Sequence, residues 1–277
     1  MTVEPTQDAQ PRVACTADAD GRIVFDLPPS APLEGRLLLR LRPKKGEPET
    51  LLHHLDLGAA AAGGRRAVLA PHTVLEEGRW DVYLLSGPDA TRHRLRPGPR
   101  DLRALVDGHL RDRRSPLAVR VPYATRGGHL AVRAWLRPAH AEVERVDVTD
   151  RTTTVSARLH GAALRETAVV RLRRRGGGAV ERALEPRSGD GDRFSFTVEH
   201  AELVAESAAG PGGDKDVWDV FVRPAADAPV VRVARLLDDL ADRKEVYVYP
   251  TVTVGGAAVR PYYTNDNDLS VEVKRPV

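Results

Sequence analysis

Short segments in which apolar and polar residues alternate recur along the whole chain. This period of two places every second side chain on the same face of an extended backbone, which is the pattern of a strand with one buried face. Clear examples are RIVFDL (22–27), RLLLRLR (36–42), LAVRAWL (130–136), TVSARLH (154–160) and RFSFTV (193–198). Clusters of Gly, Pro and Asp between the segments predict turns. The pattern therefore predicts an all-β protein, with a helical turn allowed only at 99–113 and 235–244.

The second half of the sequence repeats features of the first half. WDVYLL, which begins at Trp80, matches WDVFVR, which begins at Trp218, and VPYATRGGHLAVRA (121–134) aligns without gaps on RPYYTNDNDLSVEV (260–273). LLLRLR matches AVVRLR with Arg42 aligned on Arg173. This spacing is shorter than the one between Trp80 and Trp218, and a longer loop predicted at 206–216 accounts for the difference. We therefore expect two tandem immunoglobulin-like β-sandwiches related by an internal repeat. The predicted parts are a disordered tail (1–12), repeat 1 (13–138) and repeat 2 (139–277).

Residues that both repeats share are expected to serve the fold, because both repeats have to fold. Trp80 and Trp218 are shared, so we predict that both are buried in cores, where each indole N–H needs a hydrogen-bond acceptor. A Pro-Tyr pair is also shared, at 122–123 and 261–262. We predict that each tyrosine hydroxyl is tied to the backbone, as in a tyrosine corner.

The segment TNDND (264–268) is rich in side chains that can bind ligands. It lacks the glycine and the final glutamate of an EF-hand loop, so that kind of calcium site is excluded. Its counterpart in repeat 1 is TRGGH (125–129), and both segments are predicted to be hairpin turns. The alternative is a polar, aromatic tip suited to sugar hydroxyls. The candidate binding residues of this tip are Tyr262, Tyr263, Asn265, Asp266, Asn267 and Asp268.

The charge composition argues against a nucleic-acid binder. The 42 Lys and Arg residues are interspersed with 39 Asp and Glu residues, and the net charge is only +3. Nucleic-acid binding needs a basic face that displaces counterions. The one dense run, RLRRRGGG (171–178), is predicted to be a strand that enters a glycine turn. Only five of the basic residues are lysine, and this arginine preference, with abundant Ala, Gly and Pro, indicates a GC-rich, actinobacterial genome.

Compartment and membrane association follow from a few absences in the sequence. Cys15 is the only cysteine, so we expect no intramolecular disulfide and no thiolate metal cluster. The first residues are polar and lack the apolar region of a secretory signal. No apolar run approaches the roughly 20 residues of a membrane span. We therefore expect a cytoplasmic protein without a membrane span.

Motifs for catalysis and metal binding are missing from the sequence. It contains no G-x-S-x-G elbow, no P-loop and no G-x-G-x-x-G after a strand. Three Asp-x-Asp pairs, at 18–20, 190–192 and 266–268, stand in predicted tail or turn segments. His53 and His54 are adjacent on a predicted strand and should point to opposite faces. We therefore predict no catalytic residue, no metal site and no cofactor.

GRWDVYLL (78–85) and VRPYYTNDNDLSVEV (259–273) resemble segments in the C-terminal accessory domains of teichoic-acid-type glycosyltransferases. The predicted tandem sandwiches without disulfides resemble those domains as well. The resemblance implies a role in oligomerisation or in handling a polymer, beside a separate catalytic domain. No segment of this sequence resembles that catalytic domain, so the family's site residues have no counterparts here.

These observations favour a non-catalytic binding or scaffolding module that acts with a glycan or cell-envelope-polymer transferase. Its expected partners are a glycan polymer, a glycosyltransferase or another partner protein, or a second copy of the chain, and not nucleic acid. Two alternatives stay open. One is a structural protein–protein interaction protein without glycan affinity. The other is a transferase or hydrolase of unrecognised type with a site in the groove between the sandwiches.

Overall fold

The computed structural model describes residues 11–30, 35–44, 46–50, 52–107, 115–176, 181–209 and 214–275. Strands account for 54% of the structure and helices for 7%, which confirms the predicted all-β class. The chain forms two compact units. Unit 1 comprises Met1–Arg113, Ala118–Leu136 and Leu237–Ala241, and unit 2 comprises Arg114–Leu117, Arg137–Leu236 and Asp242–Val277. Of the tail predicted over 1–12, residues 1–10 lie outside the described residues, and Arg12 begins the first strand.

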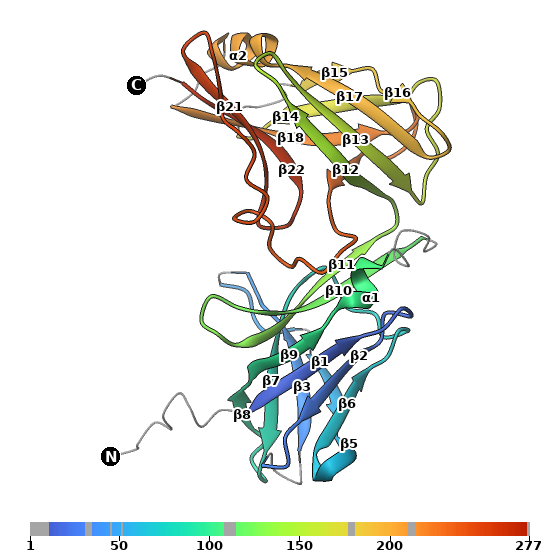
Figure 1. Cartoon of the computed structure of the whole chain (residues 1–277), viewed down its shortest axis with the longest axis vertical. Helices are drawn as coiled ribbons and strands as arrows, with labels where there is room; N and C mark the ends of the chain where they lie inside the picture. Colours follow the sequence, from blue (N-terminus) through green and yellow to red (C-terminus); the bar gives the residue numbers. More distant parts are fainter. Residues whose placement is uncertain are drawn as a thin grey trace. The chain divides into compact units, whose positions relative to one another are not determined.

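Unit 1 contains two sheets (Figure 1). The first has the order β5-β6-β2-β1-β9 and consists of β1 (Arg12–Ala17), β2 (Ile23–Leu27), β5 (Gly58–Ala59), β6 (Arg65–Leu69) and β9 (Arg96–Asp101). The second has the order β10-β11-β7-β3-β4, with β8 paired to β7. Its strands are β3 (Arg36–Leu41), β4 (Leu52–Asp56), β7 (Gly78–Ser86), β8 (Thr91–Arg94), β10 (Leu117–Ala124) and β11 (Leu130–Arg137). A 3-10 turn, η2 (Ala61–Gly63), and a short helix, α1 (Arg103–Val106), lie between strands.

Side chains from both sheets of unit 1 pack into one core. Ile23 and Phe25 enter it from the first sheet, because every second residue of β2 is buried. Leu39 and Trp80 enter it from the second sheet. Trp80 is fully buried and donates its indole N–H to the carbonyl of Glu76 at 3.0 Å. The predicted core position of this tryptophan is confirmed.

The strands of unit 2 follow one path, β16-β17-β13-β12-β19-β18-β22-β21-β20, with β14 paired to β18 and β15 to β14. The bounds are β12 (His140–Val148), β13 (Thr152–His160), β14 (Val169–Arg174), β15 (Glu181–Leu184), β16 (Arg187–Ser188), β17 (Arg193–Glu199), β18 (Lys215–Arg223), β19 (Val231–Ala234), β20 (Val252–Val254), β21 (Ala257–Tyr263) and β22 (Leu269–Lys274). Strand β19 pairs parallel to β12 and antiparallel to β18, so it joins the two halves of the path.

The core of unit 2 contains side chains from both halves of this path. Phe194 and Phe196 come from β17, and Trp218 comes from β18. Leu203 of helix α2 (His200–Ala209) also packs into this core. Trp218 donates its indole N–H to the hydroxyl of Ser207 at 3.0 Å, which confirms the predicted core role of the second tryptophan.

The helix predictions were only partly right. Helix α1 lies within the predicted segment 99–113, but 235–244 is not helical. In that segment the backbone N–H of Leu236 binds the carboxylate of Glu142 at 2.7 Å. The backbone N–H of Arg243 binds the side-chain oxygen of Asn267 at 3.0 Å, so groups from other strands replace the hydrogen bonds of a helix. The loop predicted to start at 206 is wrong as well, because α2 extends to Ala209.

The helices of the described segments are too short and too polar to cross a bilayer.

Candidate functional site

The predicted binding residues lie in the hairpin that joins β21 to β22. Its turn is closed by two backbone hydrogen bonds, from the N–H of Thr264 to Asp268 at 2.8 Å and from the N–H of Asn267 to Thr264 at 3.0 Å. Asn267 has a φ of 62°, in the left-handed region that Asn tolerates better than most residues. The turn predicted for this segment is therefore present.

The hairpin of β10 and β11 in unit 1 closes in the same way. The N–H of Thr125 binds the carbonyl of His129 at 2.9 Å, and the N–H of Gly128 binds the carbonyl of Thr125 at 2.9 Å. Gly128 has a φ of 72° and stands where Asn267 stands in the other turn. Glycine adopts this conformation without a steric penalty, so the two sequences make the same turn with different residues.

The six predicted binding residues are not all accessible. Tyr263, Asn267 and Asp268 are buried, Tyr262 is half-buried, and Asn265 and Asp266 are exposed. The carboxylate of Asp268 forms ion pairs with Arg137 at 3.1 Å and with Arg232 at 3.0 Å. Since Asn267 also holds the backbone of Arg243, the buried polar residues of the turn attach the hairpin to neighbouring segments.

Tyr262 faces a pocket of about 380 Å³ in unit 2. One wall is the irregular segment 244–249, and the other is β21. The lining residues are Lys244, Glu245, Tyr247, Val248, Tyr249, Arg260, Pro261 and Tyr262. Three tyrosines and two cationic side chains thus line one hollow. Aromatic walls with a few polar groups are typical of small-molecule sites.

Buried Tyr263 supports two of the pocket tyrosines from behind. Its ring contacts Tyr247 edge to face and lies tilted against Tyr249, each with ring centroids 6.0 Å apart. The hydroxyls of Tyr249 and Tyr263 are 3.5 Å apart. Burial raises the pKa of Tyr249, Tyr262 and Tyr263. Tyr249 and Tyr262 therefore stay protonated at neutral pH, and each hydroxyl can donate or accept a hydrogen bond.

Cationic side chains surround the pocket. Arg260 pairs with Glu272 at 3.4 Å. The guanidinium of Arg235 lies over the ring of Tyr247 at 4.9 Å, and that of Arg243 lies at 5.7 Å from the same ring. These cation–π contacts hold the Tyr247 ring in place. The pocket is thus an aromatic surface with Lys244, Arg260 and Glu245 at its edge.

Most of these lining residues were not predicted from the sequence. Tyr262 was, but Lys244, Tyr247, Tyr249 and Arg260 were not. The signal that was present is YVY (247–249), in which two tyrosines two residues apart share one face of an extended segment.

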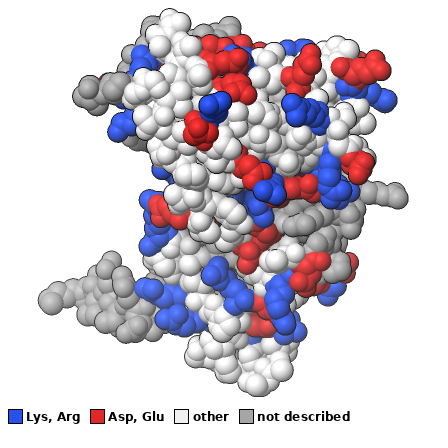
Figure 2. Space-filling view, turned by 45° about the horizontal axis from the view of Figure 1, so that its top comes forward, with Lys and Arg blue, Asp and Glu red and all other residues white. Residues whose placement is uncertain are grey.

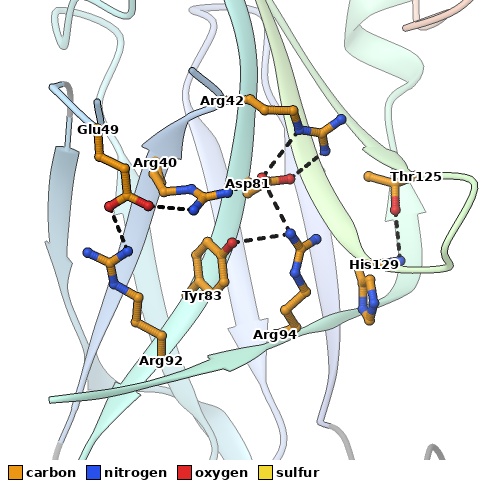
Figure 3. A network of polar contacts seen from close by, with 9 residues as sticks. All are labelled: Arg40, Arg42, Glu49, Asp81, Tyr83, Arg92, Arg94, Thr125 and His129. Carbon is orange, nitrogen blue, oxygen red and sulfur yellow. Dashed lines mark hydrogen bonds and ion pairs between the residues drawn. The ribbon is translucent and has the colours of Figure 1, made fainter. Parts of the chain in front are cut away.

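Charged side chains on the surface gather in mixed clusters. Figure 2 shows basic and acidic side chains side by side on the face that it presents. One cluster, drawn in Figure 3, surrounds the buried carboxylate of Asp81 on β7. It accepts hydrogen bonds from Arg42 at 2.6 Å, Arg40 at 3.0 Å and Arg94 at 3.5 Å. Burial alone would raise the pKa of Asp81, but these arginines, Arg42 first, outweigh burial and lower it.

Tyr83 lies beside Asp81 in the same cluster. The guanidinium groups of Arg40 and Arg94 stand 5.3 and 5.2 Å from the centre of its ring, and Arg94 also donates to its hydroxyl at 3.2 Å. Glu49 completes the cluster by binding Arg40 at 2.5 Å and Arg92 at 2.8 Å (Figure 3).

Unit 2 has a cluster of similar composition around Asp219. Arg175 binds Asp219 at 2.5 Å, and Arg232 lies at 3.4 Å from it. Arg173 and Arg232 stand over the ring of Phe221 at 5.1 and 4.7 Å. A buried or half-buried Asp, a neighbouring aromatic ring and three arginines thus occur in both units. We assign these clusters to the fold, since each connects adjacent strands of its own sheet.

The tyrosine-corner prediction is wrong for unit 1. The hydroxyl of Tyr123 is buried and has no hydrogen-bond partner among the described residues. In unit 2 the corresponding Tyr262 faces the pocket instead.

The structure brings no metal-binding group together in the part of the chain that it describes. His53 lies against Trp80 with ring centroids 5.2 Å apart, while His54 is exposed. Asp18 accepts hydrogen bonds from the backbone N–H groups of Asp20 and Arg22, so it stabilises its own turn.

The chain matches no protein-family model and no curated protein. Among solved structures it is similar to TarS of S. aureus, a teichoic acid glycosyltransferase, with 13% identity and a TM-score of 0.39 over 55% of this chain and 27% of that chain. The TarS fragment 217–571 gives 14% identity and a TM-score of 0.38, over 50% of this chain and 39% of that chain. A marsupial T cell receptor gives 9% identity and a TM-score of 0.18, over 77% and 92%. This chain spans about a quarter of the length of the TarS chain and about two fifths of the length of the fragment.

Proposed function

We propose that the protein is a non-catalytic binding module made of two copies of one β-sandwich, and that the pocket of unit 2 binds a glycan. The observation that carries the proposal is the pocket itself, where Tyr247, Tyr249 and Tyr262 meet Lys244 and Arg260. The face of a sugar ring packs on aromatic rings, and its hydroxyls pair with the tyrosine hydroxyls. Lys244 can pair with an acidic group of the sugar, whereas Arg260 is already paired with Glu272.

The strand registers support the two-copy arrangement. Arg40 lies opposite Asp81 in the β3–β7 pair, and Arg173 lies opposite Asp219 in the β14–β18 pair. Under this proposal Arg40, and not Arg42, is the counterpart of Arg173. The alignment suggested by LLLRLR and AVVRLR therefore shifts by two residues, a shift that keeps every side chain on the same face of the strand.

We further propose that the module acts together with a transferase of glycans or cell-envelope polymers. Support for this partner comes from the sequence resemblance, carried by GRWDVYLL and VRPYYTNDNDLSVEV. In such an arrangement the pocket would hold one sugar of the polymer, while the catalytic step would belong to the partner. A pocket of about 380 Å³ fits a single residue of a chain that continues into solvent.

The test is a titration of the full chain with neutral and acidic oligosaccharides, followed by NMR and calorimetry. The Tyr262→Ala variant should weaken binding by about tenfold, because it removes one stacking ring. The Lys244→Ala variant should also weaken binding. Tyr123→Ala is the matched control, because Tyr123 follows the shared proline in unit 1. Binding that survives in Tyr262→Ala, or that falls equally in Tyr123→Ala, would contradict the proposed site.

A further inference from the structure

The two hairpin turns differ in the charge that they place beside the arginine clusters. In unit 2, Asp268 ends the turn and forms an ion pair with Arg232, which also contacts Asp219. In unit 1, His129 ends the turn. Within the described part of the chain, the corresponding Arg94 pairs with a single carboxylate, that of Asp81, at 3.5 Å. A carboxylate present in unit 2 is therefore missing in unit 1.

The strand next to each turn adds to this difference in charge. In unit 2 the residue that pairs with Asp268 is Ala234. In unit 1 the backbone N–H of Leu130 binds the carbonyl of Leu95 at 2.8 Å. The next residues along, His129 and Arg96, are therefore neighbours. Unit 1 thus has Arg96 where unit 2 has Ala234, beside the position at which His129 replaces Asp268.

Two polar atoms at this place have no hydrogen-bond partner among the described residues. They are the Nε of Arg96 and the Nδ1 of His129, and both atoms are buried. Buried polar atoms are normally paired, and the described residues supply no hydrogen-bond partner for these two atoms. Arg94 is 32% exposed, and His129 and Arg96 are half-buried, so the place is open to a ligand.

We propose that Arg94, Arg96 and His129 form an oxyanion site, in which a phosphate or carboxylate group of a ligand occupies the position that the Asp268 carboxylate fills in unit 2. Guanidinium groups bind such groups through charge-assisted hydrogen bonds. Gly128 leaves room, because a Cβ added there would lie only 3.1 Å from the Nη1 of Arg96. In Figure 3 the ring of His129 lies beside Arg94, on the side away from Glu49.

The neighbouring charges agree with this assignment. Burial lowers the pKa of His129, and the charges of Arg94 and Arg96 lower it further. The imidazole is therefore neutral at pH 7 and does not repel the arginines, and it can donate one hydrogen bond to the oxyanion. The carboxylate nearest to Arg94, that of Asp81, is shared with Arg40 and Arg42.

The oxyanion site is independent of the pocket in unit 2, and simple anions test it. We would titrate the full chain with inorganic phosphate, with glucuronate and with chloride at matched ionic strength. The imidazole NMR signal of His129, assigned by its loss in His129→Asp, is the readout. Phosphate or glucuronate should shift this signal and raise the pKa of His129, whereas chloride should not. The anion that binds more tightly identifies the ligand group as a phosphate or a carboxylate.

Two variants introduce the residue that unit 2 has at the corresponding position, so the fold should tolerate them. Arg96→Ala installs the residue found at Ala234 and should weaken anion binding by at least about tenfold. His129→Asp installs an internal carboxylate, should abolish anion-induced stabilisation and should raise the Tm without any ligand. Arg66→Ala, which removes an exposed arginine paired with Asp26, is the charge-matched control. Equal losses in Arg96→Ala and Arg66→Ala, or undiminished stabilisation of His129→Asp by phosphate, would overturn the site.

Discussion

The buried carboxylate of Asp81 allows a quantitative test of the cluster in unit 1. Asp81→Asn keeps the shape of the side chain but removes its charge, and it leaves Arg40, Arg42 and Arg94 without their shared anion. The Asp81 side chain is only 1% exposed. Removing one member of a buried ion pair costs about 3–5 kcal/mol. Arg42 is 39% exposed and Arg94 is 32% exposed, so water can partly replace the carboxylate, and we expect a loss of about 3 kcal/mol.

This loss should be visible in calorimetry. For a unit of this size, 1 kcal/mol corresponds to roughly 3–5 °C in Tm, so Asp81→Asn should lower the Tm of unit 1 by about 10 °C. Asp219→Asn in unit 2 should cost less, because the Asp219 side chain is 16% exposed. Asp101→Asn serves as the control, since the Asp101 side chain is 41% exposed and pairs with the exposed Arg103, and it should lower the Tm less than Asp81→Asn does.

The pH dependence gives a second, independent check. The pKa of Asp81 is lowered in the folded state. Its contribution to stability is therefore complete above the unfolded value of about 3.9 and is lost as the pH falls through the lowered folded pKa. The difference in Tm between the wild type and Asp81→Asn should be constant from pH 5 to pH 8 and should shrink below about pH 4. A difference no larger than that of Asp101→Asn, or one that persists unchanged in strong acid, would contradict a stabilising role of the Asp81 carboxylate.

Three further predictions concern single residues. Gly128→Ala should cost about 1 kcal/mol in urea denaturation because of its left-handed backbone, whereas Gly128→Asn should cost less, as Asn267 adopts the same conformation; equal costs would contradict this. Cys15 is buried, with its pKa raised to about 12, so iodoacetamide at pH 8 should label it only in the unfolded chain, and rapid native labelling would speak against its burial. Ser207→Ala removes the acceptor of the Trp218 indole and should cost about 1 kcal/mol, which an unchanged urea midpoint would disprove.

Strands and turns were predictable because their causes are local. The alternation of RIVFDL becomes β2, in which every second residue is buried. The turn at 264–268 was predictable from its Asn and Asp residues, which tolerate the left-handed conformation that Asn267 adopts. In both cases the information lies within a few consecutive residues.

Features that depend on distant residues were not predictable. The segment 235–244 has helical spacing of its leucines, but Glu142 and Asn267 capture its backbone N–H groups. Neither partner is near in sequence, so no local pattern shows the competition. Helix α2 was missed because it buries only a narrow face, on which Leu203 and Ser207 are four residues apart.

The candidate site also combines features with local causes and features that depend on distant residues. Comparing the two halves of the sequence singled out Tyr263, because the other half has Ala124 at that place. Tyr263 is instead a core residue, since alternation along β21 turns its ring inward. Its consequence for binding is indirect: it supports Tyr247 and Tyr249. The role of Tyr263 therefore follows from its contacts with Tyr247 and Tyr249. These two tyrosines lie in a segment that has no matched counterpart in the comparison of the two halves.

Comparison of the two units separates residues that hold the fold from residues that are free to bind. Both units keep a carboxylate, an aromatic ring and arginines on adjacent strands, because each unit needs that cluster to connect its sheet. Where one unit supplies the neutralising acid itself, as with Asp268, the arginine is satisfied within the chain. Where the other unit has His129 instead, the positive charge has no such partner in the turn. A ligand anion is then the group that completes the arrangement, so the difference between the turns, and not the acidic turn by itself, indicates where binding occurs.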